Sequence, residues 1–231
     1  MKIGEMSVII DETTANNYKY QVLLDSAGLL KTFTHYRSEN TATGKIVKGK
    51  PQPESYLTEW WRKKKEHQQV NVVYKNGGKI VEETATPPEK RPKRPFVEGK
   101  YKNGTLDPVS SALWARKRIA EIIKTNPSYP QKFTMPVFDG RRRFEAEITL
   151  NGYKKKKYEG KNQDLLEVVF FRTPVNGFNE KELKRMKDQD PTVLFYMNKD
   201  LIPIMGSGSA PFGSANFRLV SLCQSADIAC K

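Results

Sequence analysis

The stretch MPVFDGRRRFEAEITL, residues 135–150, predicts a β-hairpin. Asp139-Gly140 is a dipeptide typical of a two-residue type I′ turn, and apolar residues alternate with polar ones in the flanking segments. A turn centred on this dipeptide sets Val137 opposite Arg142. Because successive side chains of a strand point to opposite faces, the three arginines after the turn are expected to alternate between the two faces of the hairpin.

The two faces of this hairpin differ in their chemistry. One is mostly apolar and carries Phe133, Met135, Val137, Arg142, Phe144, Ala146, Ile148 and Leu150. The other carries Arg141, Arg143, Glu145 and Glu147, where the arginines can pair with carboxylates or phosphate at the solvent side. Arg142 is expected at the mouth of the apolar face, where an unpaired charge is costly. We expect it either to pair with a protein carboxylate or to hold the anionic head of a ligand whose chain lies over Phe144 and Ile148.

Period-two alternation dominates the rest of the chain. The segment YKYQVLL places Tyr18, Tyr20, Val22 and Leu24 on one face. The dipeptide Asn76-Gly77 lies between two β-rich runs, and residues 192–205 indicate another hairpin. The segment NFRLVSL predicts a closing strand with Phe217, Leu219 and Ser221 on one face. These patterns predict a mostly antiparallel sheet.

Residues 107–127 predict one main helix. Asp107 is a natural N-cap, Pro108 suits the first helical position, and Asn126-Pro127 ends the helix. Its apolar stripe comprises Val109, Ala112, Leu113, Ile119 and Ile123, so the helix is expected to pack on the sheet. A shorter, largely exposed helix is predicted where Asn179 and Glu182 resemble a capping box. The expected fold is mainly β (α+β): a long antiparallel twisted sheet with one main helix packed on it, in a single domain over residues 1–231.

Composition indicates the class of partner. The chain has 40 Lys+Arg against 26 Asp+Glu, which gives a formal net charge of +14. Such a surface is expected to attract anions, for example nucleic acid, acidic lipid headgroups or anionic polysaccharide. No apolar run approaches the roughly 18 residues that span a bilayer, so no transmembrane segment is expected.

The sequence offers little for catalysis or metal binding. His35 and His67 are the only histidines, and neither has a second ligand at a recognised metal spacing. The glycine-rich segment GSGSAPFG, residues 206–213, fails the dinucleotide fingerprint and is expected to be a flexible strand connection. No nucleophile elbow is present. We therefore expect a protein that is not an enzyme and that uses no cofactor or metal.

Two stretches combine aromatic and basic residues. Trp60 and Trp61 precede the run Arg62–Lys65, and Tyr153 and Tyr158 flank four lysines. Cationic grooves with aromatic stacking platforms are typical of proteins that bind single-stranded nucleic acid. If both stretches are strands, however, alternate residues face opposite sides, and lysines on edge strands also prevent unwanted strand pairing. The second interpretation is favoured, and nucleic-acid binding is the alternative.

A series of motifs along the chain carries a resemblance to a known family. In order they are GLL, PQPESY, VVYKNG, PPE, LDPVSSAL, PVFDGRRRF, FFRTPVNGF and FGSANFRLV. From about Gly4 to Val220 the chain resembles the exported bacterial family called domain of unknown function 3108. The most specific elements are Asp107-Pro108, Phe138–Arg143 and Pro174–Gly177. The resemblance implies a periplasmic protein whose export signal and first strand are missing from this chain.

The resemblance also bears on the cysteines and on the fold. The spacing of Cys223 and Cys230 by itself leaves open a disulfide or two free thiols. An oxidising periplasm permits a bridge between them. The family's long antiparallel strands wrapped on a helix resemble the open half-barrels of periplasmic lipoprotein carriers. The resemblance therefore implies an open half-barrel as the alternative to one long twisted sheet, although a fold does not fix a function.

These expectations lead to one functional hypothesis. We expect a non-enzymatic, monomeric cell-envelope protein that binds an amphipathic or anionic, lipid-like ligand in a concavity of the sheet. The candidate ligand-binding residues are Trp60, Trp61, Asp139, Arg141, Arg142, Arg143 and Phe144. The alternatives are a nucleic-acid-binding protein that uses basic and aromatic strands and, third, an envelope hydrolase.

Overall fold

The computed structural model describes residues 2–11, 16–63, 66–88, 94–188, 192–210 and 213–223. Within these ranges the chain forms two six-stranded antiparallel sheets and four helices, so the protein is mainly β. The expectation of one long sheet was wrong. Alternation along a strand predicts which side chains share a face, but it carries no information about which strand lies alongside.

The chain divides into two compact units. The first comprises Met1–Trp114 with Pro136–Arg143, and the second comprises Ala115–Met135 with Phe144–Lys231. The main helix, α3 (Pro108–Lys124), and strand β7 (Gln131–Phe138) each contribute residues to both units. Because single elements are shared in this way, the expectation of one domain over residues 1–231 stays a prediction.

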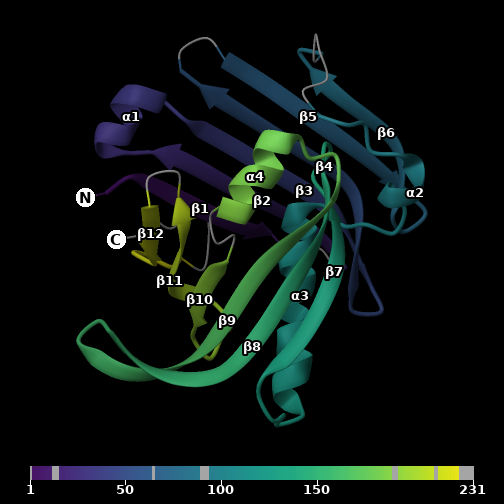
Figure 1. The fold of residues 1–231 in the computed structure, drawn as a ribbon. Helices are drawn as coiled ribbons and strands as arrows, with labels where there is room; N and C mark the ends of the chain where they lie inside the picture. Colours follow the sequence, from purple (N-terminus) through teal and green to yellow (C-terminus); the bar gives the residue numbers. More distant parts are fainter. Residues whose placement is uncertain are drawn as a thin grey trace. The chain divides into compact units, whose positions relative to one another are not determined.

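The first sheet is a meander in which each strand pairs with the next along the chain (Figure 1). Its strands are β1 (Gly4–Asp11), β2 (Asn17–Ser26), β3 (Arg37–Val47), β4 (Lys50–Arg62), β5 (Glu66–Lys75) and β6 (Lys79–Thr86). Helix α1 (Gly28–Thr34) connects β2 to β3, and α2 (Gly99–Lys102) follows β6. The predicted hairpin at Asn76-Gly77 is confirmed, since both residues have the positive φ of a tight turn, 49° and 72°.

One face of the first sheet, termed the core face, packs the core of the first unit. Four of its buried residues lie in one register row: Tyr20, Ala42, Tyr56 and Val72. The same cluster includes Tyr18, Val70, Tyr74, Val109, Leu113 and Phe138. The predicted placement of Tyr18 and Tyr20 on one face is confirmed, and both residues are buried. Leu24, on the same face near the end of β2, is 36% exposed.

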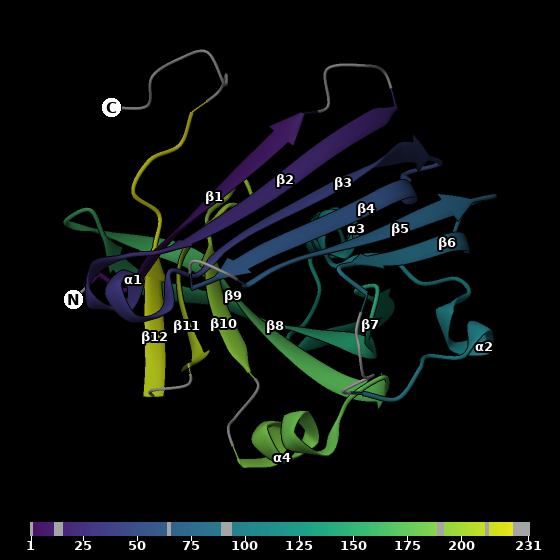
Figure 2. The same cartoon turned by 90° about the horizontal axis from the view of Figure 1, so that it is seen from above.

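The second sheet has the spatial order β12-β11-β10-β9-β8-β7 (Figure 2). Besides β7, its strands are β8 (Arg143–Tyr158), β9 (Lys161–Asn176), β10 (Val193–Met197), β11 (Pro203–Ala210) and β12 (Gly213–Arg218). The predicted hairpin over 192–205 is confirmed as β10 and β11. The predicted closing strand ends earlier than expected, so Leu219 and Ser221 lie outside it.

The glycine-rich segment was wrongly expected to be a strand connection. Gly206–Ala210 lies within β11, where it pairs with β12. A Cβ on Gly206 would lie 2.2 Å from both the Leu194 carbonyl oxygen and the Phe217 ring, so only glycine fits at this position. The remainder of the segment includes Pro211 and Phe212, which lie outside the described residues.

Both predicted helices are present. Asp107 Oδ1 accepts backbone hydrogen bonds from Val109 (2.9 Å) and Ser110 (2.8 Å), which confirms the N-cap of α3. Within the predicted stripe, Val109, Leu113 and Ile119 are buried but Ala112 is exposed, so that part of the stripe was wrong. Asn179 and Glu182 form the predicted reciprocal capping box of α4 (Glu180–Asp188), which has no buried residue.

Candidate functional site

The turn between β7 and β8 differs from the predicted one. The Asp139 amide donates to the Arg142 carbonyl (3.1 Å), so Gly140 and Arg141 are the central residues, and Gly140 has a φ of 83°. Asp139 Oδ1 in turn accepts the amides of Arg141 (3.0 Å) and Arg142 (2.7 Å). The prediction was wrong because the Asp139 side chain caps the turn from its first position instead of occupying a central one.

The shift in the turn changes the environment of each arginine. Arg143 is the first residue of β8 and is 9% exposed, so it is buried and not on the solvent side as expected. Arg142 closes the turn, and its Nε lies 3.0 Å from Asp139 Oδ2. The expected pairing of Arg142 with a carboxylate is therefore confirmed. The predicted apolar face of β8 is also confirmed, since Phe144, Ala146, Ile148 and Leu150 are all buried.

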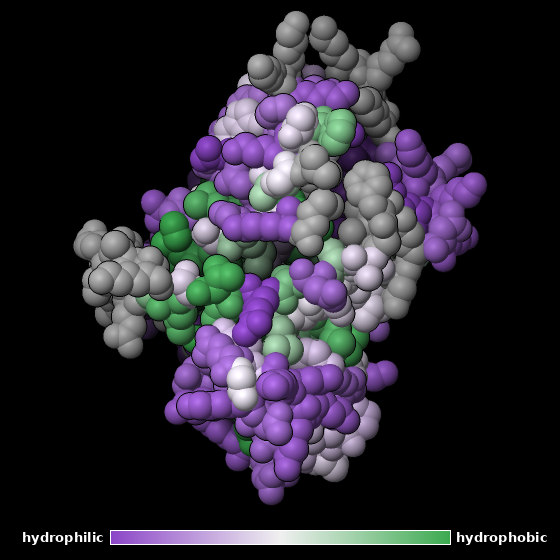
Figure 3. Space-filling model, turned by 90° about the vertical axis from the view of Figure 1, so that its left-hand side faces the viewer, coloured by the Kyte–Doolittle hydropathy of each residue, from purple (hydrophilic) through white to green (hydrophobic). Residues whose placement is uncertain are grey.

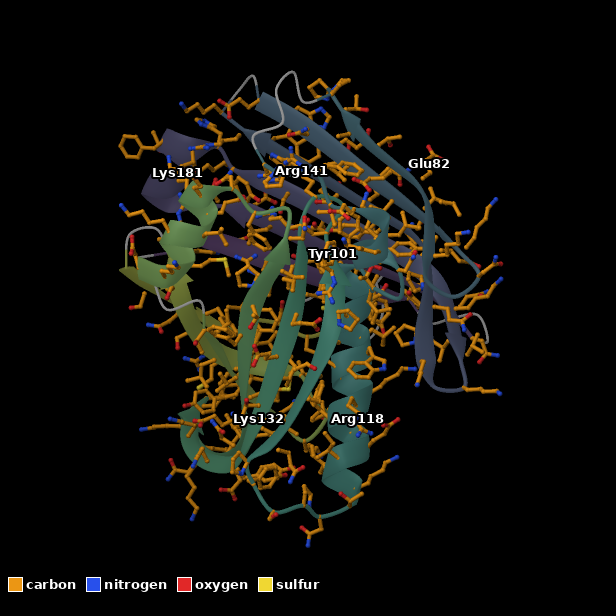
Figure 4. All side chains as sticks on the ribbon, turned by 45° about the vertical axis from the view of Figure 1, so that its right-hand side comes forward. Glu82, Tyr101, Arg118, Lys132, Arg141 and Lys181 are labelled. Atoms are coloured by element: carbon orange, nitrogen blue, oxygen red, sulfur yellow. The ribbon has the colours of Figure 1, made fainter. Side chains whose placement is uncertain are left out.

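Arg141 lies against the core face of the first sheet (Figure 4). Its guanidinium is 5.1 Å from the centre of the Trp60 ring, a distance that permits a cation–π interaction. Its Nη2 donates to Gln68 Oε1 at 3.2 Å. The structure thus brings together three residues from distant segments: a planar cation, an aromatic ring and an amide.

Trp61 and Phe144 are not part of this group. Trp61 points to the opposite face of β4, where it stacks on His67 at 5.0 Å and has Arg37 5.6 Å from its ring. Phe144 belongs to the second unit, where Arg172 lies 5.6 Å from its ring centre. Of the basic run after Trp61, Lys63 lies in the turn after β4, and Lys64 and Lys65 lie outside the described residues.

The register of the paired strands aligns Trp60, on the core face, with apolar side chains at the edge of the same sheet. One row crosses five strands: Met6, Leu24, Ser38, Trp60 and Gln68. We call it the Met6–Gln68 row. Adjacent strands are about 4.8 Å apart, so the row spans roughly 19 Å. Met6 is 58% exposed, and Val8 and Ile10, on the same face of β1, are exposed as well.

Exposed apolar side chains of this kind are not rare on the protein. Figure 3 shows a surface on which hydrophobic residues gather between hydrophilic ones. The Met6–Gln68 row differs from a scattered set because it joins exposed apolar groups to a cation–aromatic pair along one face of one sheet. Sequence reasoning missed it, because β1 showed no strong alternation and Gln68 carried no signal of its own.

A buried polar cluster beneath the core face was also missed. Asp107 is fully buried, and burial raises its pKa to about 6 despite hydrogen bonds from Ser110 and Val109. The Tyr18 hydroxyl lies 2.8 Å from Ser110 Oγ. Among the described residues, Asp107 Oδ2 and the Tyr74 hydroxyl have no hydrogen-bond partner. Burial and the charge of Asp107 hold the pKa of Tyr74 well above its usual value.

The remaining features add little to a site. A depression of about 260 Å³ on the β7–β8 hairpin is lined by Lys132, Phe133, Thr134, Glu147, Ile148 and Thr149. It is smaller than typical ligand pockets of roughly 300–1,000 Å³.

In the part of the chain that the structure describes, no three metal-ligating residues come together, and none of the helices combines the length and apolar character that a membrane span requires. Cys223 is disulfide-bonded, whereas Cys230 lies outside the described residues, so their pairing stays a prediction.

The fold and the candidate site define a mainly β protein of two antiparallel sheets, with a row on one of them that runs from exposed apolar side chains to Trp60 and Gln68, where the Arg141 guanidinium lies. The chain belongs to the family described as "Protein of unknown function (DUF3108)", whose model matches residues 1–220. The resemblance carried by the motifs is thereby confirmed. A search of curated proteins gives no match.

One solved structure extends the comparison of the fold. The chain is similar to a crystal structure of a β-barrel-like protein of domain of unknown function DUF1849 from Brucella abortus. The TM-score is 0.52 with 10% sequence identity, over 95% of this chain and 88% of that one. At this identity the likeness concerns the fold alone.

Proposed function

We propose that this protein is a non-enzymatic, periplasmic protein of the cell envelope that binds an anionic, amphipathic, lipid-like ligand on the core face of its first sheet. The observation that carries the proposal is the Met6–Gln68 row. The ligand's apolar part lies over Leu24 and Met6, and its anionic head meets the Arg141 guanidinium beside Trp60. The net charge of +14 supports the choice of an anion.

Each end of the row suits its part of such a ligand. Leu24 and Met6 present apolar surface to solvent, and covering it is favourable by roughly 25 cal/mol per Å². Arginine binds phosphate or carboxylate through a planar set of donors, and stacking on Trp60 holds that plane in a fixed orientation.

Dodecyl phosphate tests the proposal, with dodecanol as the neutral matched probe. Arg141→Gln is expected to weaken dodecyl phosphate binding about tenfold in calorimetry and to leave dodecanol binding unchanged. Leu24→Ser is expected to weaken both. The matched controls are Leu23→Ser, on the opposite face of β2, and Arg118→Gln, an exposed arginine on α3. The proposal is wrong if neither probe binds, or if Arg141→Gln and Leu24→Ser bind as tightly as their controls.

Nucleic-acid binding is the alternative function, and the same residues test it. The Trp60 ring has Arg141 over it and the Trp61 ring stacks on His67, so each indole already has a protein partner. Open stacking platforms for bases are therefore not offered at these two positions. Binding of a single-stranded oligonucleotide that Arg141→Gln abolishes, without any dodecyl phosphate binding, would favour this alternative.

A further inference from the structure

The longest hairpin of the protein extends beyond the strands that flank it. Strands β8 and β9 have 16 residues each and are joined at Glu159-Gly160. Strand β10 pairs only with Leu166–Phe170 of β9. Strand β7 has 8 residues and starts its pairing at the Asp139–Arg142 turn, so it reaches only as far as about Leu150. The remaining residues, 151–165, form a two-stranded tip, visible as the long curved end of the hairpin in Figure 1.

The tip is strongly basic. It carries five lysines, Lys154, Lys155, Lys156, Lys157 and Lys161, and all but Lys156 are exposed. Its acidic residues are Glu159 and Asp164, so the lysines outnumber the acidic residues. Tyr153, which precedes the lysines, is 48% exposed.

One face of the tip is held in place by the rest of the second unit. Tyr158 is buried, and its hydroxyl donates to the Leu219 carbonyl at 3.2 Å. Arg218 lies 4.9 Å from the Tyr158 ring, and the Lys156 ammonium lies 4.4 Å from the Tyr196 ring. Because side chains alternate along β8, Tyr153, Lys155 and Lys157 point to the opposite face. The tip thus presents a fixed basic face with one exposed tyrosine.

We propose that this tip docks the protein on an anionic lipid bilayer. Exposed lysines are attracted to anionic headgroups, and tyrosine is enriched at the level of the headgroups because it is apolar with a polar end. A nucleic acid fits less well, since Tyr158 is buried and the Tyr196 ring already has a lysine over it, which leaves few open rings for stacking. The docking surface is separate from the proposed ligand site and does not depend on it.

Vesicle sedimentation of the full chain, without dodecyl phosphate or dodecanol, tests the proposal. Wild type is expected to bind phosphatidylglycerol–phosphatidylcholine vesicles, to lose most binding at high salt, and not to bind pure phosphatidylcholine vesicles. The variant Lys155→Gln/Lys157→Gln is expected to bind about 25-fold more weakly, because each lysine near an anionic surface strengthens binding roughly fivefold. The matched control, Lys181→Gln/Lys184→Gln on the exposed helix α4, removes the same charge and is expected to bind nearly as wild type.

Several outcomes would overturn the docking surface. Absence of binding to anionic vesicles does so, and so does an equal loss in both double variants, which would show a general effect of net charge. Binding of duplex DNA that only the tip variant loses, without vesicle binding, would assign the face to nucleic acid. Leu24→Ser serves as the cross-check: normal vesicle binding by this variant separates the docking surface from the proposed ligand site.

Discussion

Gly140 lies directly against Val70. A Cβ on Gly140 would come within 2.4 Å of Val70 Cγ1 and 3.1 Å of Val72 Cγ2, and both valines are fully buried. The β7–β8 turn therefore packs on the core face through the backbone of Gly140, which has no side chain. This contact fixes the position from which Arg141 reaches Trp60 and Gln68.

Gly140→Ala is expected to destabilise the protein by about 3 kcal/mol. Its φ of 83° is strained for alanine, and the added methyl group overpacks the two valines. Urea unfolding measures the loss. Gly104→Ala is the control, because Gly104 also has a positive φ, 72°, but a Cβ added there would have no neighbouring atom within 4 Å. Equal losses in the two variants would contradict the packing account.

Asp107 is expected to make stability fall as pH rises from about 4 to about 6. Burial raises its pKa in the folded protein from 3.8 to about 6, so the folded state binds the proton more tightly than the unfolded state in this window. A shift of roughly two units corresponds to about 3 kcal/mol lost above pH 6. Asp107→Asn keeps an N-cap oxygen and should lack this dependence, which makes it more stable than wild type at pH 7.

Urea unfolding of wild type and Asp107→Asn between pH 4 and pH 7.5 measures the difference between their pH profiles. Asp107→Ala is the control that loses the cap as well and should be less stable than Asp107→Asn by about 1 kcal/mol at every pH. Parallel profiles for wild type and Asp107→Asn would show that the carboxyl does not titrate in this window.

Lys102→Ala is expected to destabilise the protein by about 2 kcal/mol. The Lys102 side chain is 11% exposed, and its ammonium lies 2.5 Å from Glu83 Oε2 and 4.4 Å from the Phe96 ring centre. Removing it leaves a partly buried carboxylate without its cation, a cost that the 27% exposure of Glu83 reduces. Lys100→Ala, in the same helix, removes an exposed pair with Glu98 and is expected to leave the stability unchanged in the same unfolding assay.

Arg142→Leu separates a structural role from a ligand-binding one. The side chains of Arg142 and Asp139 are 27% and 16% exposed, so losing their ion pair is expected to cost about 1 kcal/mol in thermal unfolding. Dodecyl phosphate binding should stay at the wild-type level. A stable variant that no longer binds the probe would instead place the ligand head at Arg142.

Cys223 and Cys230 are predicted to be bridged to each other. The chain has two cysteines, and Cys223 is disulfide-bonded. Alkylation under denaturing conditions should label neither cysteine before reduction and both afterwards. Replacing both with serine is expected to cost about 2 kcal/mol, because so short a loop removes little freedom from the unfolded chain. Two thiols that react before reduction would contradict the bridge.

The sequence by itself determined the features that depend on neighbouring residues. Alternation in β2 and β8, the N-cap at Asp107, the hairpin at Asn76-Gly77 and the capping box of α4 were all predicted, because each arises from residues a few positions apart. The family resemblance rested on short motifs of the same kind.

Only the tertiary structure decided the features that join distant segments. The division into two sheets depends on which strands pair, and the packing of the β7–β8 turn on the core face depends on the close approach of Gly140 to Val70. From this position Arg141 lies over Trp60, which is distant in the sequence. The Met6–Gln68 row needs the register of five strands, and no local pattern carries this register because strand pairing is a long-range interaction.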